Sequence, residues 1–264
     1  MINRRDFLKL GGALLAGGLI STKSTPAQAV PLDANIVYQG VNLKGWQVKL
    51  GDALYPPDDV FPSDIKTVHP TGYSELRANV NRRVIMAHNT TCKKIINPAA
   101  LTSIHTCSVS FRLPYLPIPD TGAALNGQTV ESGIFVWDGA KTRLDYGMAF
   151  QWIVNPWGDG AMPQGTLRVW SGSNWLQVGE LTVDTNWHTL KMVVDFKRKN
   201  TLLLIDNKYQ LSRFSKTPKD DSWGDTVDAR FQVEAVSIDP RPDNIIQAMH
   251  RVQFKNWKWL WETA

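Results

Sequence analysis

Hydrophobic and polar side chains alternate along much of this chain with a period of two, the pattern typical of β-strands that bury one face. The alternation is clearest in residues 144–155, where every second residue is large and apolar: Tyr146, Met148, Phe150, Trp152 and Val154. The other row is small or polar apart from Ile153, and small residues separate Asp145 from Gln151. We interpret this segment as a central strand whose second face is either ordinary solvated surface or the floor of a binding groove.

Similar segments recur at short intervals, separated by Gly, Pro, Asn and Asp residues that are typical of turns. They cover residues 72–80, 106–113, 132–137, 166–170, 175–181, 187–196, 202–205, 209–214, 231–238 and 251–261, with shorter candidates within 35–46 and 83–88. No segment shows a convincing 3.6-residue period of an amphipathic helix. The pattern predicts an all-β fold in which two antiparallel sheets pack face to face as a β-sandwich.

The first 29 residues have the layout of an export signal. A charged start containing Arg4 and Arg5 is followed by the apolar run 10–20 and by the small-residue exit Ala27-Gln28-Ala29. The apolar run is too short to span a membrane. The arginine pair and the nearby Phe-Leu-Lys resemble a twin-arginine (Tat) signal, which engages the Tat translocation machinery. The alternative is a chance arginine pair in an ordinary secretory signal, and both interpretations make the mature chain periplasmic or secreted.

Removal of the signal changes the charge of the chain. Residues 1–29 hold four of the 29 basic residues and one of the 24 acidic residues, which leaves 25 basic and 23 acidic residues. This near-neutral balance, without a basic run or recognition motif, gives no reason to expect a nucleic-acid partner. Residues 30–264 contain no low-complexity linker, and their length suits one large β domain, so we expect a single domain with no membrane span.

The chain has two cysteines, Cys92 and Cys107. Because disulfides persist outside the cytoplasm, we predict a bond between them, and two buried free thiols are the alternative. A bond that closes a loop of this length would stabilise the fold by about 3 kcal/mol on a chain-entropy estimate. We expect no metal site and no other cofactor, because there is no further cysteine and the five histidines show no ligand spacing.

Two neighbouring strands carry a recognisable hairpin pattern. Residues 186–196 read N-W-H-T-L-K-M-V-V-D-F, and residues 202–208 read L-L-L-I-D-N-K. The pair resembles the W-H-x-L-x-V-x-x-D … L-x-I-D-G/N-x hairpin of the concanavalin A-like lectin/glucanase superfamily, and residues 252–257 are similar to its F-x-N-V end strand. The resemblance implies a jelly-roll β-sandwich. It does not imply one function, because the fold occurs in lectins, glycosidases, polysaccharide lyases and adhesion modules. We assign His188 of this hairpin a structural role, although the sequence reveals no partner for it.

The enzymes of this superfamily need groups that the chain lacks or holds only in part. A retaining glucanase needs two carboxylates about 5 Å apart, and the E-x-D-x-x-E strand that supplies them in the laminarinase-type family is absent. A lyase needs a cation or amide at the sugar carboxylate and a Tyr or His that takes the C5 proton. Residues 73–77, Y-S-E-L-R, resemble the R-S/T-E-L-R strand of alginate-lyase-type jelly rolls. Gln151 matches the glutamine of their Q-x-H strand, but the histidine and the third motif, Y-x-K-x-G-x-Y-x-Q, are missing.

Polar residues and tryptophans still suggest a ligand. Eleven tryptophans are present, some of them in loops and turns where an indole can stack on a sugar ring. Polar residues recur in the outward rows, and arginine beside carboxylate or hydroxyl groups suits hydrogen bonding to sugars, acidic ones especially. If these strands share one sheet, they form one binding surface. The alternatives are a convex solvated face with weak ion pairs and loop indoles folded over the core. The candidate ligand-binding residues are Glu75, Arg77, Arg112, Asp145, Gln151, Trp157, Arg168, Trp170, Trp175 and Lys191.

These observations predict an exported carbohydrate-binding protein that recognises an envelope or environmental polysaccharide or an oligosaccharide derived from it. If the protein is an enzyme, a lyase acting on uronate polymers is favoured over a glycoside hydrolase. A scaffold or protein-interaction module of the cell envelope is the third class.

Overall fold

The structure is a computed structural model, and it describes residues 34–50, 65–80, 84–117, 127–137, 144–156, 162–170, 175–198, 200–214, 226–237 and 248–263. The predicted export signal, residues 1–29, and Trp157 lie outside these ranges. Among the described residues, no helix has the length and apolar character needed to cross a membrane.

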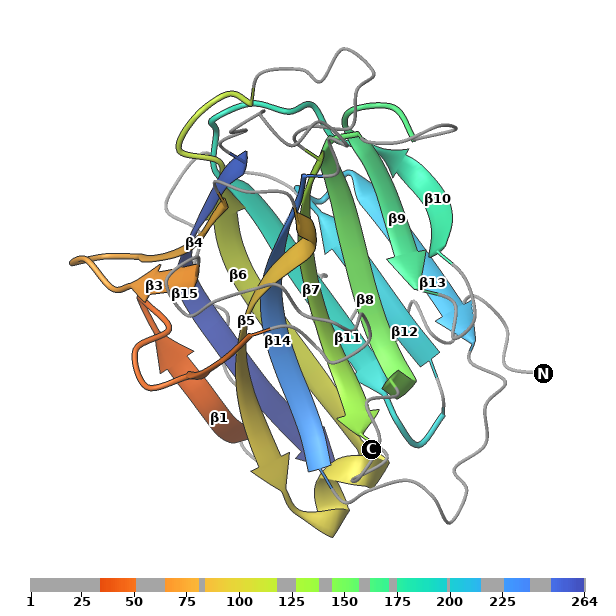
Figure 1. The fold of residues 1–264 in the computed structure, drawn as a ribbon. Coiled ribbons are helices and arrows are strands. Elements are labelled where there is room, and N and C mark those ends of the chain that lie inside the picture. Colours follow the sequence, from red (N-terminus) through yellow and green to blue (C-terminus); the bar gives the residue numbers. More distant parts are fainter. Residues whose placement is uncertain are drawn as a thin grey trace, which may run out of the picture. The chain divides into compact units, whose positions relative to one another are not determined.

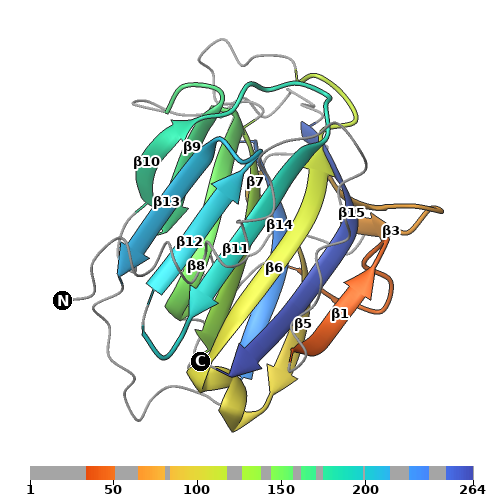
Figure 2. The ribbon, with the colours of Figure 1, turned by 180° about the vertical axis from the view of Figure 1, so that it is seen from behind.

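The described residues form two antiparallel sheets and one short 3-10 helix, η1 (Pro98–Thr102). Sheet A, nearer the viewer in Figure 2, has the order β13 (Tyr209–Phe214), β12 (Asn200–Ile205), β11 (His188–Asp195), β6 (Ser103–Arg112), β15 (Ala248–Thr263), β4 (Ser74–Val80) and β3 (Ile65–Val68), and β1 (Asn35–Gly40) also pairs with β15. Sheet B, nearer the viewer in Figure 1, has the order β10 (Trp175–Glu180), β9 (Thr166–Trp170), β8 (Leu144–Asn155), β7 (Gly127–Trp137), β14 (Thr226–Ser237), β5 (Val84–Ile96) and β2 (Gln47–Leu50).

The hydrophobic core lies between the two sheets and follows the alternation seen in the sequence. Burial alternates residue by residue along the whole of β6. The Phe111 ring of β6 lies 5.8 Å from the ring centroids of both Phe150 and Trp152 of β8, so the apolar rows of the two sheets meet. Burial of each of these rings stabilises the fold by roughly 2–3 kcal/mol. The prediction of an all-β, two-sheet antiparallel sandwich is therefore confirmed.

The predicted disulfide is wrong. Cys107 is a free thiol with no exposed surface, and it lies on the core side of β6 in sheet A. Cys92 belongs to β5 of sheet B, where the backbone register places it opposite Arg230 and Gln47. Burial raises the pKa of the Cys107 thiol well above its ordinary value, which makes it unreactive in the folded protein.

Two buried histidines act as neutral hydrogen-bonding groups. His250 of β15 donates from Nε2 to the backbone carbonyl of Thr129 in β7 at 2.6 Å, which joins sheet A to sheet B. His105 of β6 donates from Nε2 to the carbonyl of Ala100 at 2.8 Å and accepts at Nδ1 from the indole of Trp259 at 3.1 Å. Burial lowers the pKa of both imidazoles to about 4.

His188, the third histidine in the core, has two partners that the sequence did not reveal. Its Nδ1 lies 2.7 Å from a carboxylate oxygen of Asp206, and its Nε2 lies 3.1 Å from one of Asp184. Asp206 also accepts the backbone N–H of Thr189 at 2.7 Å. Burial would raise the pKa of Asp206, but hydrogen bonds from Thr189 and His188 lower it below its ordinary value. The group ties the β12–β13 turn to the start of β11, which supports a structural role for the histidine.

The free thiol predicts a simple labelling result. In the folded protein, Cys107 should not react with a soluble thiol reagent at neutral pH, because burial shields it and keeps it protonated. In urea without any reductant, Cys107 should react fully. A Cys92→Ser variant, in which Cys107 is the remaining thiol, assigns the reaction to this residue. Absence of a free thiol in unfolded, unreduced parent protein would contradict the structure.

The neutral histidines predict sensitivity to acid. Their folded-state pKa of about 4 lies below the unfolded value near 6.5, so the unfolded chain binds more protons between these pH values. The free energy of unfolding should therefore fall as pH decreases from about 6.5 towards 4. Each histidine contributes up to about 3 kcal/mol to this fall. Urea unfolding at pH 7, 6, 5 and 4.5 measures the effect, and His105→Gln should flatten the pH dependence. An equal slope for the variant and the parent would refute this origin.

Candidate functional site

The outer face of sheet B carries a row of polar side chains on three adjacent strands. Phe150 and Trp152 of β8 point into the core, so Gln151 between them points to the other face. The register places Gln151 opposite Glu131 of β7 on one side and opposite Arg168 of β9 on the other. We call these three residues the polar row.

Hydrogen bonds join the polar row from end to end. Gln151 donates from Nε2 to a carboxylate oxygen of Glu131. Its Oε1 accepts from Nε of Arg168 at 2.8 Å and also from the Nη2 of that guanidinium. Gln151 itself is only 4% exposed. An amide that gives one bond to an anion and takes two from a cation has its orientation fixed, which holds both charged groups in place.

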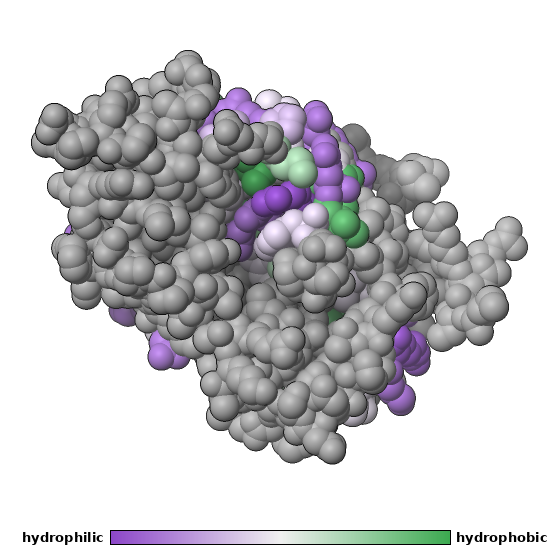
Figure 3. Space-filling view, turned by 45° about the vertical axis from the view of Figure 1, so that its right-hand side comes forward, coloured by the Kyte–Doolittle hydropathy of each residue, from purple (hydrophilic) through white to green (hydrophobic). Residues whose placement is uncertain are grey.

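An indole lies beside the cationic end of the polar row. The guanidinium carbon of Arg168 lies 5.6 Å from the centroid of the Trp175 ring in β10, within the range of a cation–π contact. Trp175 is partly exposed and stands opposite Trp170 in the β9–β10 hairpin, which forms as the sequence predicted. From a viewpoint turned toward β9 and β10, Figure 3 shows hydrophilic and hydrophobic described residues side by side on the surface.

The line of polar residues continues into the strands beyond Glu131. Gln232 of β14 lies opposite Glu131 in the backbone register, and Thr90 of β5 lies opposite Gln232. Polar residues therefore occupy one line across five adjacent strands. Sequence reasoning missed Glu131, because it began this strand at residue 132, whereas β7 begins at Gly127. The alternation of Thr129, Glu131 and Gly133 was the signal that could have revealed it.

The other predicted site residues lie elsewhere. Glu75, Arg77, Arg112 and Lys191 belong to β4, β6 and β11 of sheet A, on the opposite side of the sandwich from the polar row. Asp145 and Trp170 belong to strands of sheet B, but their side chains are outside the described part of the structure, as is all of Trp157. The single surface that the sequence allowed is thus divided between two sheets, and the partial lyase motifs at residues 73–77 and at Gln151 do not share a face.

On sheet A, the predicted residues form a second hydrogen-bonded cluster around Glu75. This carboxylate is 1% exposed and accepts from Nε of Arg77 at 2.5 Å and from Nε of Arg251 at 2.9 Å. Gln253 donates to it at 2.7 Å and accepts at Oε1 from Nε of Arg112 at 2.9 Å. Burial would raise the pKa of Glu75, but hydrogen bonds from Arg251, Gln253 and Arg77 hold it below its ordinary value. Arg251 and Gln253 were not among the site residues predicted from the sequence.

Neither cluster has the composition of a metal centre. Within the described part of the chain, no group of three or more His, Cys, Asp or Glu side chains could hold a metal ion. The polar row can instead offer a ligand rich in hydroxyl groups a carboxylate that accepts hydrogen bonds and a guanidinium that donates them, both held by the central amide.

Comparison with known proteins identifies the fold. No protein-family model matches this sequence, and neither does any curated protein. Lectin I from Ulex europaeus, solved in complex with the methyl glycoside of α-L-fucose, is 10% identical over 88% of this chain and 99% of the lectin chain, with a TM-score of 0.51. A Bacillus subtilis protein of unknown function with a galectin-like fold is 9% identical over 88% of this chain and 97% of its own, with a TM-score of 0.49. An endo-β-1,4-glucuronan lyase from Trichoderma reesei is 10% identical over 87% of this chain and 96% of its own, with a TM-score of 0.46. The chain has the concanavalin A-like jelly-roll fold that the hairpin resemblance implied.

The polar row predicts a specific cost of removing its central amide. Gln151→Leu leaves the half-buried side chains of Glu131 and Arg168 without their shared partner, so the free energy of unfolding should fall by about 1–3 kcal/mol. Gln177→Leu is the matched control, because Gln177 is exposed and stands opposite Arg168 on the next strand. Its effect should stay within about 0.5 kcal/mol. Urea unfolding of both variants measures the difference, and equal stabilities would show that the amide does not hold the row together.

Proposed function

We propose that this chain is an exported carbohydrate-binding protein and that it holds an envelope or environmental polysaccharide along the outer face of sheet B. The single observation that carries the proposal is the polar row: a carboxylate, an amide and a guanidinium are hydrogen-bonded in line across three strands. The row stands at the non-core face of the sheet and ends beside the indole of Trp175.

The chemistry of the row suits a sugar. Neighbouring hydroxyl groups both donate and accept hydrogen bonds, so a carboxylate that accepts beside a guanidinium that donates can bind a pair of them. The fixed orientation of Gln151 prepares these groups before the ligand arrives, which lowers the entropic cost of binding. A partly exposed indole offers flat apolar area to the C–H face of a sugar ring. The concanavalin A-like fold, which the Ulex europaeus lectin shares, supports the proposal as an analogy.

The location of this activity follows from the first 29 residues. Their charged start, short apolar run and small-residue exit support delivery to the periplasm or the outside of the cell, with the arginine pair favouring the Tat machinery. A protein in either place meets envelope and environmental polysaccharides directly.

A polysaccharide lyase is the alternative that one observation favours. Gln151 and Arg168 could neutralise the carboxylate of a uronate unit, as a lyase requires. The described hydrogen bonds of the polar row bring no Tyr or His to it that could take the C5 proton. A binding role therefore accounts for the described geometry more completely.

The proposal predicts that Trp175→Ala and Arg168→Ala each weaken binding to the cognate glycan by about tenfold or more, because each removes a contact at the end of the row. A glycan array of neutral and acidic polysaccharides identifies the ligand, and titration calorimetry measures the change. Leu176→Ala is the matched control, since this exposed residue neighbours Trp175 on the same strand. Unchanged binding by both row variants would exclude this face.

The same preparations separate binding from turnover. Incubation with alginate or glucuronan would generate unsaturated uronate ends that absorb in the near ultraviolet if the protein is a lyase. Release of reducing ends from β-glucans would indicate a hydrolase. For the proposed binding protein, both signals should stay at the level of the buffer.

A further inference from the structure

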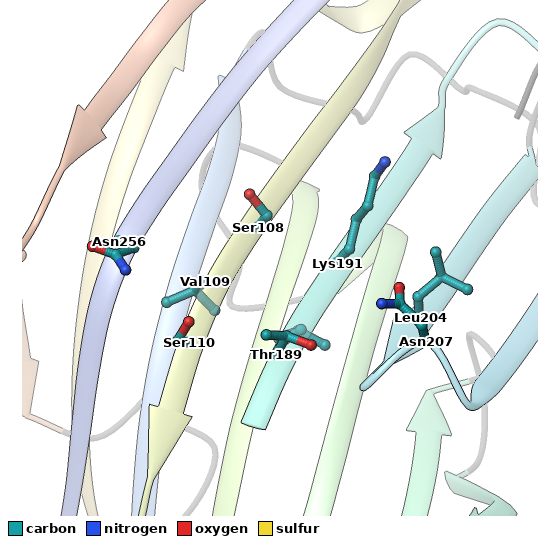
Figure 4. A pocket seen from close by; sticks show the side chains of 9 residues that line it. Ser108, Val109, Ser110, Thr189, Lys191, Leu204, Asn207 and Asn256 are labelled. Atoms are coloured by element: carbon teal, nitrogen blue, oxygen red, sulfur yellow. The ribbon is translucent and has the colours of Figure 1, made fainter. Parts of the chain in front are cut away.

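The outer face of sheet A contains a polar hollow of about 270 Å³, on the other side of the sandwich from the polar row. Figure 4 shows the side chains around it, which come mainly from β6 and β11. Its hydrogen-bonding members are Ser108, Ser110, Thr189, Lys191, Asn207 and Asn256. Five of these six are uncharged and small, so the polar part of the lining consists of hydroxyl and amide groups around one ammonium, and Val109, Leu190 and Leu204 complete the lining.

Two irregular backbone positions shape the rim of the hollow. The register of β15 against β6 shifts between Lys255 and Lys258, and Asn256 within this bulge has a φ of 56°. Asn207 follows Asp206 in the β12–β13 turn and has a φ of 55°. Asparagine tolerates this left-handed conformation better than most residues. The backbone conformation at Asn207 and Asn256 therefore helps to set the positions of their side-chain amides at the rim.

Two lysines lie on either side of Ser108 on the neighbouring strands of sheet A. Ser108 of β6 stands opposite Lys191 of β11 on one side and opposite Lys258 of β15 on the other. Among the described residues, no carboxylate pairs with either lysine. Burial lowers the pKa of Lys191, and repulsion by Lys258 lowers it further. Two like charges beside a serine hydroxyl form a position where an anionic group would relieve repulsion.

Further cations continue along the same face. Lys255 stands opposite Ser110, and its Nζ lies 4.0 Å from the ring centroid of Trp187. The guanidinium carbon of Arg112 lies 4.7 Å from the same centroid. These cation–π contacts restrict where the charged groups lie. Together with the cluster around Glu75, they form what we call the basic face: Arg77, Arg112, Lys191, Arg251, Lys255 and Lys258.

The charge of the basic face stands out against the rest of the chain. Residues 30–264 hold 25 basic and 23 acidic residues, so they are nearly neutral as a whole. The basic face, in contrast, gathers six cations, and Glu75 is the carboxylate hydrogen-bonded among them. Asp195 and Glu262, both opposite Ile104 in the register, lie further along the same strands. A local concentration of one sign on a nearly neutral chain attracts and orients a ligand of the opposite sign.

We propose that the basic face binds an acidic polysaccharide, with one carboxylate or sulfate group held between Lys191 and Lys258 and the sugar hydroxyls held in the hollow. Hydroxyl and amide groups in a concave surface complement sugar hydroxyls. A single-stranded nucleic acid would instead use exposed aromatic platforms for its bases, and the indole on this face is engaged by two cations. The inference does not rest on the proposed function of sheet B, because the two surfaces share no residue.

Titration calorimetry of the full protein with polygalacturonate, dextran sulfate and neutral dextran tests the proposal. The first or second polymer should bind and neutral dextran should not, and the pair of acidic polymers distinguishes carboxylate from sulfate recognition. The double variant Lys191→Gln/Lys258→Gln should bind at least about tenfold more weakly. It should also unfold at no lower urea concentration than the parent, since it loses a repulsion. Lys44→Gln removes an exposed cation from the turn after β1 and should change affinity less than about twofold.

Three outcomes would overturn the proposal. The first is binding of acidic polymers that the double variant does not weaken. The second is equal binding of neutral dextran. The third is binding of single-stranded oligodeoxythymidine or of phosphatidylglycerol vesicles as tight as that of the acidic polysaccharides, with the same loss in the double variant, which would indicate a nucleic-acid or membrane surface instead. If the sheet B variants do not alter glycan binding, the proposal for the basic face of sheet A still stands.

Discussion

The contact of Phe111 with Phe150 and Trp152 is the interaction on which the rest of the structure depends. It commits alternate residues of β6 and β8 to the core, and the period of two then sends the residues between them outward. Gln151 and Arg112 are therefore surface-directed because of where their apolar neighbours pack. A register slip of one residue would exchange the two rows, so the core specifies the outer faces as firmly as it specifies itself.

Both outer faces use a glutamine as a two-sided connector between opposite charges. Gln151 donates to Glu131 and accepts from Arg168 on sheet B, while Gln253 donates to Glu75 and accepts from Arg112 on sheet A. A carboxylate in place of either amide could not donate, and an ammonium could not accept. The amide thus separates a carboxylate from a guanidinium by one side chain while holding both. Glu131, Arg168 and Arg112 stay partly exposed in this arrangement, whereas Glu75 is buried.

Much of the fold could be predicted from the sequence, because alternation within a strand is a local property. Phe150, Trp152 and Val154 are buried as their row predicted, and the β9–β10 and β11–β12 hairpins form where turn residues separate alternating segments. The assignment of strands to sheets could not be predicted, since the inward rows of both sheets look alike. That is why Arg112 and Gln151 were candidates for one shared surface, although they lie on different sheets. The prediction of a Cys92–Cys107 disulfide was wrong for the same reason, because the spacing of two cysteines along the chain does not show which sheet each of them joins. The partners of His188 were hidden because Asp206 meets it only when the hairpin closes.

The strand order of sheet A has a consequence for how the protein is made. β15 lies between β6 and β4 and also pairs with β1. These early strands therefore cannot form all of their backbone hydrogen bonds until β15, the last strand of the sheet, has been synthesised. Such long-range pairing makes folding slow and leaves open sheet edges until the last partner arrives. Sheet A therefore cannot close while its final strand is still in the ribosome.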